Sequence, residues 1–257
     1  WPLPLEKLRA LQELVTEQWG KGHTVPSTSP WNSPAFVITK QTGKWRLLRD
    51  LRKSNDVMED RGSLQPRLPS PTMIPQYWHL TVTDLKDWFF SIPLHPNDAL
   101  KFAFSVPDIN MQQPLQRYHW VVLPQGMKNS PTICQWYVAR ILSPAREALP
   151  DALIHHYKDD IPVAAQSPEL MEKALALTAS TVTQVGFCVA PEKIQNEPPW
   201  KYLGWRIRTQ TVVPQPLQIS AHMETLHAAQ KLLGTTNWVR PLWGISNADL
   251  SPLCELL

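Results

Sequence analysis

The stretch IHHYKDDIPVAA, from Ile154 to Ala165, places two adjacent carboxylates in an apolar setting. Asp159 and Asp160 follow Lys158 directly, with short apolar runs on either side. Neighbouring carboxylates repel each other, so an apolar environment raises the pKa of one of them or requires a cation. Three interpretations are open at this point: a metal site, a solvated surface turn, or the remnant of a lost site.

The sequence around this pair predicts a hairpin between two helices. ALIHHY and IPVAA have the composition of short strands, which puts the acids at the turn. Before the hairpin, Asn129 or Ser130 caps a helix that has Pro131 in its first turn. The apolar stripe predicted for this helix consists of Ile133, Trp136, Tyr137 and Ile141. After the hairpin, the next helix is predicted from residues 167–169 to Gly186.

The whole chain predicts an α+β fold, with helices packed on one side of an antiparallel sheet. Leucines and valine between Leu5 and Val15 have helical spacing, and residues 24–34 are predicted as an extended loop. A strand is predicted from His79 to Thr83. Two further hairpins are predicted at residues 35–52, around Gln41-Thr42-Gly43, and at residues 201–214. The tail from Ser220 is predicted to be helical, with breaks at Gly234 and Asn237.

Composition limits the function classes. The 257 residues are enough for two or three subdomains, and the net charge of +3 permits a nucleic-acid partner without requiring one. The three scattered cysteines predict buried thiols in a reducing, intracellular compartment, and zinc-ligand spacing is absent from the sequence. No apolar run reaches the roughly 20 residues of a membrane span, and the first residues do not resemble a secretion signal.

A second acidic position gives the pair a possible partner. Asp84 and Asp87 lie at the predicted end of the strand that begins at His79. If this strand neighbours the hairpin, three carboxylates converge, and such a cluster is costly without divalent cations. Oxygen ligands favour Mg²⁺ or Mn²⁺, and two ions about 4 Å apart can clamp the oxygens of a phosphoryl transfer. The basic hairpin residues Lys40 and Arg46 suit a triphosphate.

Each of these features has an ordinary explanation when it is taken alone. Adjacent aspartates are usually a solvated turn, the basic residues of the hairpin are usually a solvated face, and Trp88, Phe89 and Phe90 are usually core. The order in which the features follow one another favours a functional site.

The ordered set resembles the fingers, palm and start of the thumb of a retroviral reverse transcriptase, of the betaretrovirus or endogenous-retrovirus K type. WPLPLEKLRAL resembles the first helix, and SPWNSPAFVITKQTGKWRLLRDLRKSN the fingers hairpin. TDLKDWFFSIPL resembles the strand with the first catalytic aspartate, LPQGMKNSPTICQ the nucleotide-pocket loop and its helix, and YKDD the YXDD box. PPWKYLGWRI resembles the primer grip, and QKLLGTTNWVRPLWGI the first thumb helices.

The resemblance implies a right-hand polymerase, cut from a longer Pol protein that includes RNase H. It assigns residues 1–59 and 92–129 to the fingers, 60–91 and 130–209 to the palm, and 210–257 to a partial thumb. The implied activity is RNA-directed DNA polymerisation on an RNA or DNA template with a primer, using dNTPs and two Mg²⁺ ions, with Mn²⁺ as a substitute. A homodimer or a heterodimer is left open, and no membrane partner is expected.

The resemblance also implies roles for individual residues. Phe89 corresponds to the aromatic gate that excludes a 2′-OH, and Trp238 is expected to pack rather than to contact nucleic acid. The implied catalytic and metal-binding residues are Asp84, Asp159 and Asp160. The implied nucleotide-binding residues are Lys40, Arg46, Asp87, Phe89, Gln125 and Gly126. The implied primer-terminus residues are Tyr157, Lys158, Leu203, Gly204 and Trp205.

Three departures from the family pattern raise an alternative. Lys158 stands where the family usually has Met, Val or Ile, and its ammonium is expected to compete with Mg²⁺. Pro162 removes a donor from a strand of the sheet, and His155 with His156 adds a charge near the site. The alternative is an impaired copy that only binds RNA or template–primer. A viral RNA-dependent RNA polymerase is disfavoured, because Phe89 excludes the 2′-OH that such an enzyme must admit.

Overall fold

The computed structural model describes residues 3–40, 43–62, 70–109, 112–209, 211–215 and 225–255. The chain divides into two compact units, which are treated separately below. Unit 1 consists of Trp1–Pro69 and Trp78–Ile194, and unit 2 consists of Ser70–Tyr77 and Gln195–Leu257. Helices mix with antiparallel sheets, which confirms the α+β prediction. Among the helices described, none combines the length and the apolar character needed to cross a membrane.

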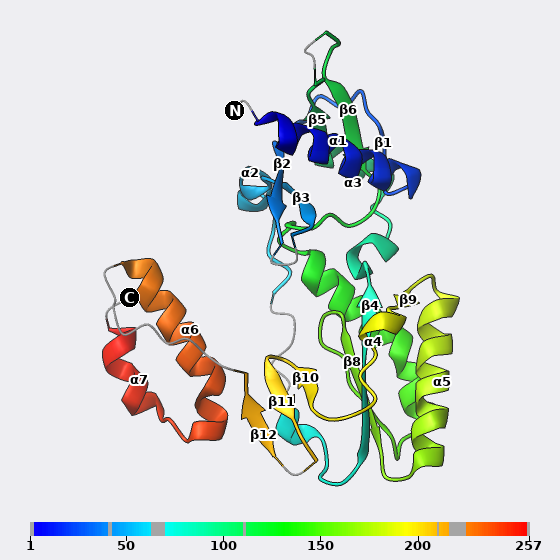
Figure 1. The fold of residues 1–257 in the computed structure, drawn as a ribbon, viewed down its shortest axis with the longest axis vertical. Coiled ribbons are helices and arrows are strands. Elements are labelled where there is room, and N and C mark those ends of the chain that lie inside the picture. Colours follow the sequence, from blue (N-terminus) through cyan, green and yellow to red (C-terminus); the bar gives the residue numbers. More distant parts are fainter. Residues whose placement is uncertain are drawn as a thin grey trace. The chain divides into compact units, whose positions relative to one another are not determined.

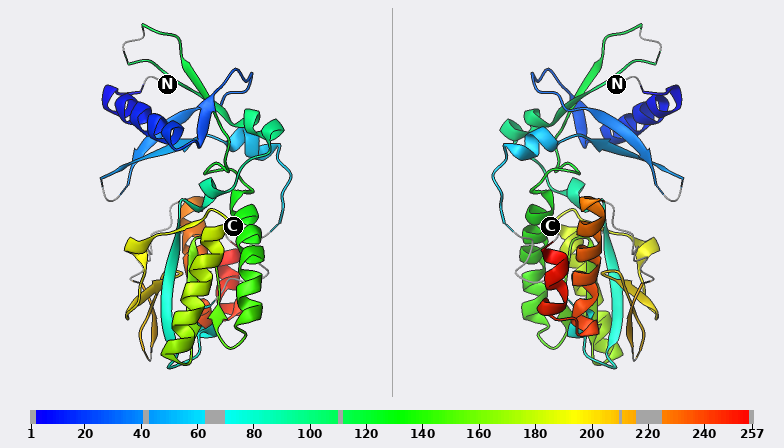
Figure 2. Two further views of the ribbon diagram at one scale, coloured as in Figure 1. Left: turned by 90° about the vertical axis from the view of Figure 1, so that its right-hand side faces the viewer. Right: turned by 90° about the vertical axis from the view of Figure 1, so that its left-hand side faces the viewer.

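A four-stranded antiparallel sheet lies in unit 1, with two helices against it (Figures 1 and 2). The strand order is β7-β8-β4-β9. The helices are α4 (Ser130–Ala148) and α5 (Pro168–Gln184). The strands are β7 (Leu153–Ile154), β8 (Asp160–Ala165), β4 (His79–Lys86) and β9 (Cys188–Val189). Strands are therefore confirmed on both sides of the acidic pair, although β7 covers only two residues of the predicted ALIHHY.

Burial explains why these segments form this layer. In β8 every residue after Asp160 is buried, because the strand is central and helices cover one face. Buried apolar side chains of the sheet meet buried side chains of the two helices in one core, which includes Leu85, Ile161, Val163, Val138, Leu142 and Val182.

Of the stripe predicted for helix α4, Ile133, Tyr137 and Ile141 pack against the core, partly buried, and Trp136 does not. The buried apolar residues of the helix are Cys134, Val138, Leu142 and Ala145, whereas Trp136 is 60% exposed. The most deeply buried positions of the helix lie next to the predicted stripe and carry small or branched side chains that fit against the sheet. Asn129 occupies the N-cap position as predicted, although its side chain makes no capping hydrogen bond. Of the cysteines, Cys134 is buried, but Cys188 and Cys254 are exposed, contrary to prediction.

The rest of unit 1 contains the hairpin predicted at residues 35–52. Strands β2 (Ala35–Thr39) and β3 (Trp45–Arg49) pair antiparallel, whereas the expected turn residues 41 and 42 lie outside the described residues. Helix α1 (Leu5–Gly20) packs on this hairpin. The predicted loop at residues 24–34 contains a strand, β1 (Thr24–Pro26), because β6 supplies a pairing partner. The remaining elements are β5 (Ala103–Val106), β6 (Gln116–Trp120), α2 (Arg52–Asp56), α3 (Pro96–Ala99), and the 3₁₀ turns η2 (Trp88–Ser91), η3 (Leu100–Phe102) and η4 (Pro191–Lys193).

Unit 2 combines a small antiparallel sheet with two helices. The sheet has the order β10-β11-β12. The hairpin predicted at residues 201–214 is part of it, and a third strand completes the sheet. Helix α6 (Leu226–Trp243) runs unbroken through Gly234 and Asn237, so the predicted breaks are wrong, and Gly244 with φ 68° ends the helix. Residues 220–224 of the predicted helical tail lie outside the described part. The other elements are β10 (Trp200–Tyr202), β11 (Trp205–Ile207), β12 (Val212–Pro214), η1 (Pro71–Met73) and α7 (Asn247–Cys254).

Candidate active site

The pairing of β4 with β8 brings the predicted carboxylates to one place. Asp84 lies directly opposite Asp160 in the register. The Leu85 N–H donates to the Asp159 carbonyl at 2.8 Å, so the Asp84–Asp160 pair is of the type without mutual hydrogen bonds. In such pairs the Cα atoms lie about 4.5 Å apart and both side chains point to the same face. Asp159 precedes Asp160 at the turn, so all three acids stand at one end of the central strands.

Burial, and after it the neighbouring charges, change the pKa values of Asp84 and Asp160. The pKa of Asp160 is raised to about 7, first by burial and then by the charges of Asp159 and Asp84. Burial also raises the pKa of Asp84, and the charge of Asp159 adds to this, whereas Lys193 lowers it. Like charges that face each other across two strands destabilise the pair. The arrangement therefore favours a cation at this end of the sheet.

A lysine that the sequence analysis did not predict supplies such a cation. Lys193 Nζ lies 2.7 Å from Asp84 Oδ1. Lys193 ends η4, and the Ala190 N–H just before η4 donates to the Asp84 carbonyl at 2.8 Å. This backbone bond holds the segment beside β4 and brings the ammonium to the carboxylate.

The three carboxylates fit divalent cations by their chemistry. Hard oxygen donors with a net negative charge suit Mg²⁺ or Mn²⁺. Within the described ranges, no three carboxylate, imidazole or thiolate groups are arranged as a ready ligand set. The Asp84 carboxylate is instead bound to Lys193. The donor chemistry of the carboxylates thus suits a divalent cation, while in this structure Asp84 is paired with Lys193.

A cavity of about 1060 Å³ in unit 1 gathers most of the residues predicted to bind the nucleotide. The side chains of Arg46 and Gln125 meet in its wall, because Arg46 Nη2 donates to Gln125 Oε1 at 3.0 Å and Nε donates to the same atom at 3.3 Å. The wall includes Lys40, Arg46, Asp87, Phe89, Gln125, Lys158, Asp159 and Lys193. As far as the chain is described, Gly126, Asp84, Asp160 and Tyr157 are outside this lining.

Two family profiles match the chain. The description "Reverse transcriptase (RNA-dependent DNA polymerase)" matches residues 38–207, and "Reverse transcriptase thumb domain" matches residues 214–257. The chain belongs to the reverse transcriptase family.

Curated relatives agree with this membership. Gag-Pro-Pol polyproteins of mouse mammary tumor virus (strain BR6) and squirrel monkey retrovirus are each 49% identical to the chain over 258 aligned residues, and that of sheep pulmonary adenomatosis virus is 47% identical. The alignments cover all of this chain and 14–15% of each polyprotein. The chain thus spans about one seventh of the length of these relatives, and its similarity to betaretroviral Pol extends over its whole length.

The turn of this reverse transcriptase chain directs Lys158 away from the acids. Tyr157 and Asp160 exchange backbone hydrogen bonds of 2.9 and 3.1 Å, which leaves Lys158 and Asp159 as the two turn residues. The Lys158 ammonium lies 5.5 Å from the centre of the Tyr157 ring, and within the described chain it forms no ion pair with a carboxylate. Its effect on the pKa of Asp160 is the smallest of those identified. The cation beside the carboxylates is therefore Lys193, not Lys158.

Gln135 holds this turn and was missed by the sequence analysis. Its side chain is buried on α4, where Oε1 accepts from the Lys158 N–H at 2.8 Å and Nε2 donates to the His156 carbonyl at 3.3 Å. Lys158 has φ 56°, a strained value for a residue with a side chain. The buried glutamine compensates for this strain. The signals in the sequence were its place at the end of the stretch LPQGMKNSPTICQ and in the helix before the hairpin.

The other two departures do not disturb the site. His156 is buried and its pKa is lowered to about 4, mainly by burial, so it is neutral at pH 7. Burial also lowers the pKa of His155. The Pro162 carbonyl accepts from the His155 N–H at 3.0 Å. Because N–H and C=O of one residue point to the same side of a strand, the missing donor of Pro162 faces the edge strand β7 and leaves the ladder with β4 intact.

In unit 2, the residues predicted for the primer grip form the turn of the β10–β11 hairpin. Leu203 and Gly204, with φ 50° and 74°, connect the paired residues Tyr202 and Trp205. The Trp205 ring lies 4.7 Å from the ring of Trp238 on α6. A Cβ added to Gly204 would lie 2.7 Å from Trp238. Trp238 therefore packs against this turn, as predicted.

Proposed function

We propose that this chain is the RNA-directed DNA polymerase domain of a retroviral Pol protein, which extends a primer with dNTPs by two-metal phosphoryl transfer. The observation that carries the proposal is the register of β4 and β8, in which Asp84 faces Asp160 beside the turn residue Asp159. The cavity that contains Lys40 and Arg46 also reaches Asp159. The family membership and the betaretroviral relatives support the same activity.

The proposed organisation is that of a right hand. Residues 1–59 and 92–129 form the fingers, residues 60–91 and 130–209 form the palm, and residues 210–257 form part of the thumb. The profile match over residues 214–257, described as a thumb domain, supports the last segment. The helix-backed antiparallel sheet in unit 1 supports the palm assignment.

The proposed chemistry assigns a task to each group. Two bound Mg²⁺ ions, or Mn²⁺ ions, would polarise the reacting phosphate and activate the primer 3′-hydroxyl. Asp84, Asp159 and Asp160 would hold these ions. Lys40 and Arg46 hold the triphosphate, since guanidinium groups bind phosphate through two hydrogen bonds at once. Lys193 lines the same cavity and keeps Asp84 neutralised when no ion is bound.

The remaining assignments concern the sugar, the base pair and the primer. Phe89 lines the cavity and restricts the space at the 2′ position of the incoming nucleotide. Asp87, Gln125 and Gly126 shape the nucleotide pocket. We assign the primer terminus to Tyr157, Lys158, Leu203, Gly204 and Trp205.

Primer extension on an RNA template tests the proposal. The purified protein, incubated with a primed RNA template, should incorporate dNTPs in the presence of Mg²⁺ or Mn²⁺ and stop when EDTA is added. It should favour dNTPs over rNTPs, which distinguishes it from an RNA-dependent RNA polymerase. If the protein binds template–primer but does not extend it with either metal, the proposal is contradicted. The alternative, an impaired copy that only binds nucleic acid, would then be favoured.

A further inference from the structure

The loop that carries Gln125 forms hydrogen bonds with residues at the end of α2 and just after it. This loop, residues 124–130, joins the region after β6 to α4 and contains Gly126 with φ 90°. The Ser130 hydroxyl donates to the Pro124 carbonyl at 2.9 Å, which closes the loop at its base. The contact between Arg46 and Gln125 holds it from the β2–β3 hairpin. These two contacts do not hold the middle of the loop, from Gly126 to Asn129.

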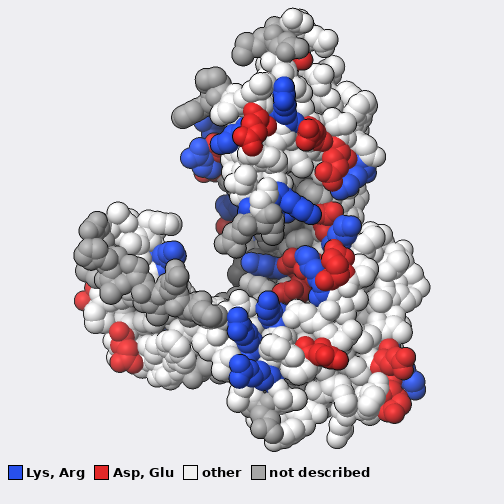
Figure 3. Space-filling model, in the orientation of Figure 1, with Lys and Arg blue, Asp and Glu red and all other residues white. Residues whose placement is uncertain are grey.

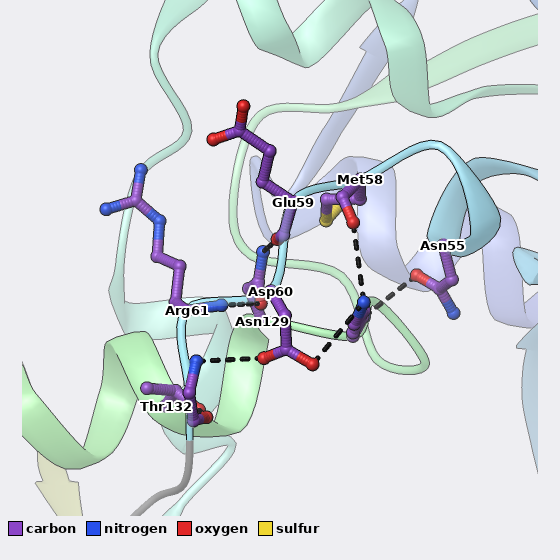
Figure 4. A network of polar contacts seen from close by, with 9 residues as sticks. Asn55, Met58, Glu59, Asp60, Arg61, Asn129 and Thr132 are labelled. Atoms are coloured by element: carbon purple, nitrogen blue, oxygen red, sulfur yellow. Dashed lines mark hydrogen bonds and ion pairs between the residues drawn. The ribbon is translucent and has the colours of Figure 1, made fainter.

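Asn55, near the end of α2, supplies two contacts there, and Figure 4 shows the one that its side-chain oxygen makes with Lys128. Its Nδ2 donates to the Gly126 carbonyl at 2.9 Å, and its Oδ1 accepts from the Lys128 N–H at 2.8 Å. One half-buried amide therefore fixes the backbone on both sides of Met127. Both polar ends of the side chain are used, so the geometry of the loop is determined at two points.

In the same way, an asparagine of the loop forms hydrogen bonds with the backbone after α2. Asn129 Nδ2 donates to the Glu59 carbonyl at 2.8 Å, and its Oδ1 accepts from the Arg61 N–H at 3.3 Å. Lys128 Nζ lies 3.4 Å from Asp60 Oδ2. This explains why the Asn129 side chain does not cap α4. Two asparagines thus bind each other's backbone segments. Figure 4 shows the Asn129 side chain between the backbone of Glu59 and Arg61, with Asn55 nearby.

We propose that Asn55 is a positioning residue for the incoming nucleotide. By fixing the Gly126 carbonyl and the Lys128 amide, it keeps the Gln125 side chain against Arg46 in the cavity wall. The inference rests on the proposed polymerase function and goes beyond it, because Asn55 does not line the cavity within the described chain. It acts through the loop.

Steady-state primer extension by Asn55→Ala tests the inference. Without the two bonds, Gln125 loses its fixed position, so we expect the KM for dNTP to rise about tenfold while kcat changes less than about threefold. The Mg²⁺ concentration required and the Kd for template–primer should stay unchanged. The control is Gln12→Ala, which removes a half-buried amide whose Nε2 donates to the Pro107 carbonyl at 2.9 Å, on a loop that carries no cavity residue. Its KM should equal that of the wild type.

A double-mutant cycle with Gln125→Ala separates positioning from general stability. If Asn55 acts through Gln125, then Asn55→Ala should raise KM less than about twofold in the Gln125→Ala background. The isosteric Asn55→Asp keeps the bond from Lys128 and loses the one to Gly126, so it should raise KM in the same direction; it replaces Asn55→Ala if that variant does not fold. The inference would be overturned if Asn55→Ala left KM unchanged, or if it raised KM equally in the wild-type and Gln125→Ala backgrounds. Either result would leave the proposed function intact. A wild-type chain without extension would overturn the proposed function and this inference with it.

Discussion

Lys193 Nζ lies 2.7 Å from Asp84 Oδ1, so a lysine neutralises one of the three acids at the centre of the proposed active site. Asp84 is largely buried, with 13% of its side chain exposed, whereas Lys193 is 55% exposed. The lysine can therefore leave for solvent at little cost while the carboxylate stays in place. Figure 3 shows positive and negative side chains next to each other over the middle of the face drawn.

The ion pair predicts competition between Lys193 and divalent cations. Lys193→Met should tighten Mn²⁺ binding in the absence of nucleotide about two- to fivefold, the range of an exposed ion pair. Binding can be followed by the paramagnetic relaxation of water protons. The control is Lys158→Met, which should change Mn²⁺ affinity less, because that ammonium lies against the Tyr157 ring. A larger effect for Lys158→Met would restore the view that Lys158 weakens the site.

The raised pKa of Asp160 predicts a pH dependence of stability. Its pKa is about 7 in the folded chain and 3.8 in the reference state. Between these values the folded state binds more protons than the unfolded state, so the free energy of unfolding falls as pH rises from about 4 to about 7. In EDTA, the Tm should therefore decrease over this range, and less so in Asp160→Asn or at millimolar Mg²⁺. An identical slope for Asp160→Asn would show that other groups cause the decrease.

The turn between β10 and β11 predicts a specific requirement for glycine. Gly204→Ala should lower the free energy of unfolding by about 2–4 kcal/mol, because the new Cβ meets Trp238 and φ is positive. Gly22→Ala is the matched control: φ is 73° and nothing lies within 4 Å, so only the conformational cost of about 1 kcal/mol remains. Thermal unfolding of both variants gives the comparison. If both variants lose the same free energy of unfolding, the Trp238 side chain moves aside for the new Cβ without an energetic cost.

The place of Phe89 in the cavity wall predicts its part in sugar selection. Phe89→Ala should reduce the preference for dNTP over rNTP at least about tenfold, because removing the ring opens space for a 2′-OH. The measurement is the ratio of kcat/KM values for dCTP and CTP on one template. Phe90→Leu serves as the control, since Phe90 lines the same cavity while its ring is stacked on Trp120, with 5.0 Å between the ring centres. Unchanged selectivity in Phe89→Ala would place the gate at another residue.

The sequence predicted those parts of the fold that depend on local pattern. Alternating apolar residues and turn composition were sufficient for the hairpin at residues 35–49 and for the strands around Lys158 and Asp159. The neighbouring positions of β4 and β8 followed from the resemblance rather than from periodicity. Gly234 did not break α6, because a single glycine costs only about 1 kcal/mol in a helix.

The missed residues share one property: each acts on a partner that is distant in the sequence or lies on another element. Lys193 stands 109 residues from Asp84, in a short 3₁₀ turn without periodicity. Gln135 looks like an ordinary helix residue until the hairpin is placed beside it. Asn55 and Asn129 exchange backbone contacts across 71 and 70 residues of sequence. Such pairs follow from the tertiary packing of strands and loops, which a single sequence does not specify.

The effect of Asp159→Asn on single-turnover extension tests the central claim most directly. The matched control is Asp151→Asn, an exposed aspartate before β7 in the same unit. Both variants should bind template–primer as the wild type does. We predict that Asp159→Asn lowers the extension rate on an RNA template about a thousandfold or more at millimolar Mg²⁺, since metal ligation contributes several kcal/mol to such a reaction, and that Asp151→Asn stays within about twofold of the wild type. Extension by Asp159→Asn at the rate of Asp151→Asn would contradict the assignment of these carboxylates as the metal site of a polymerase.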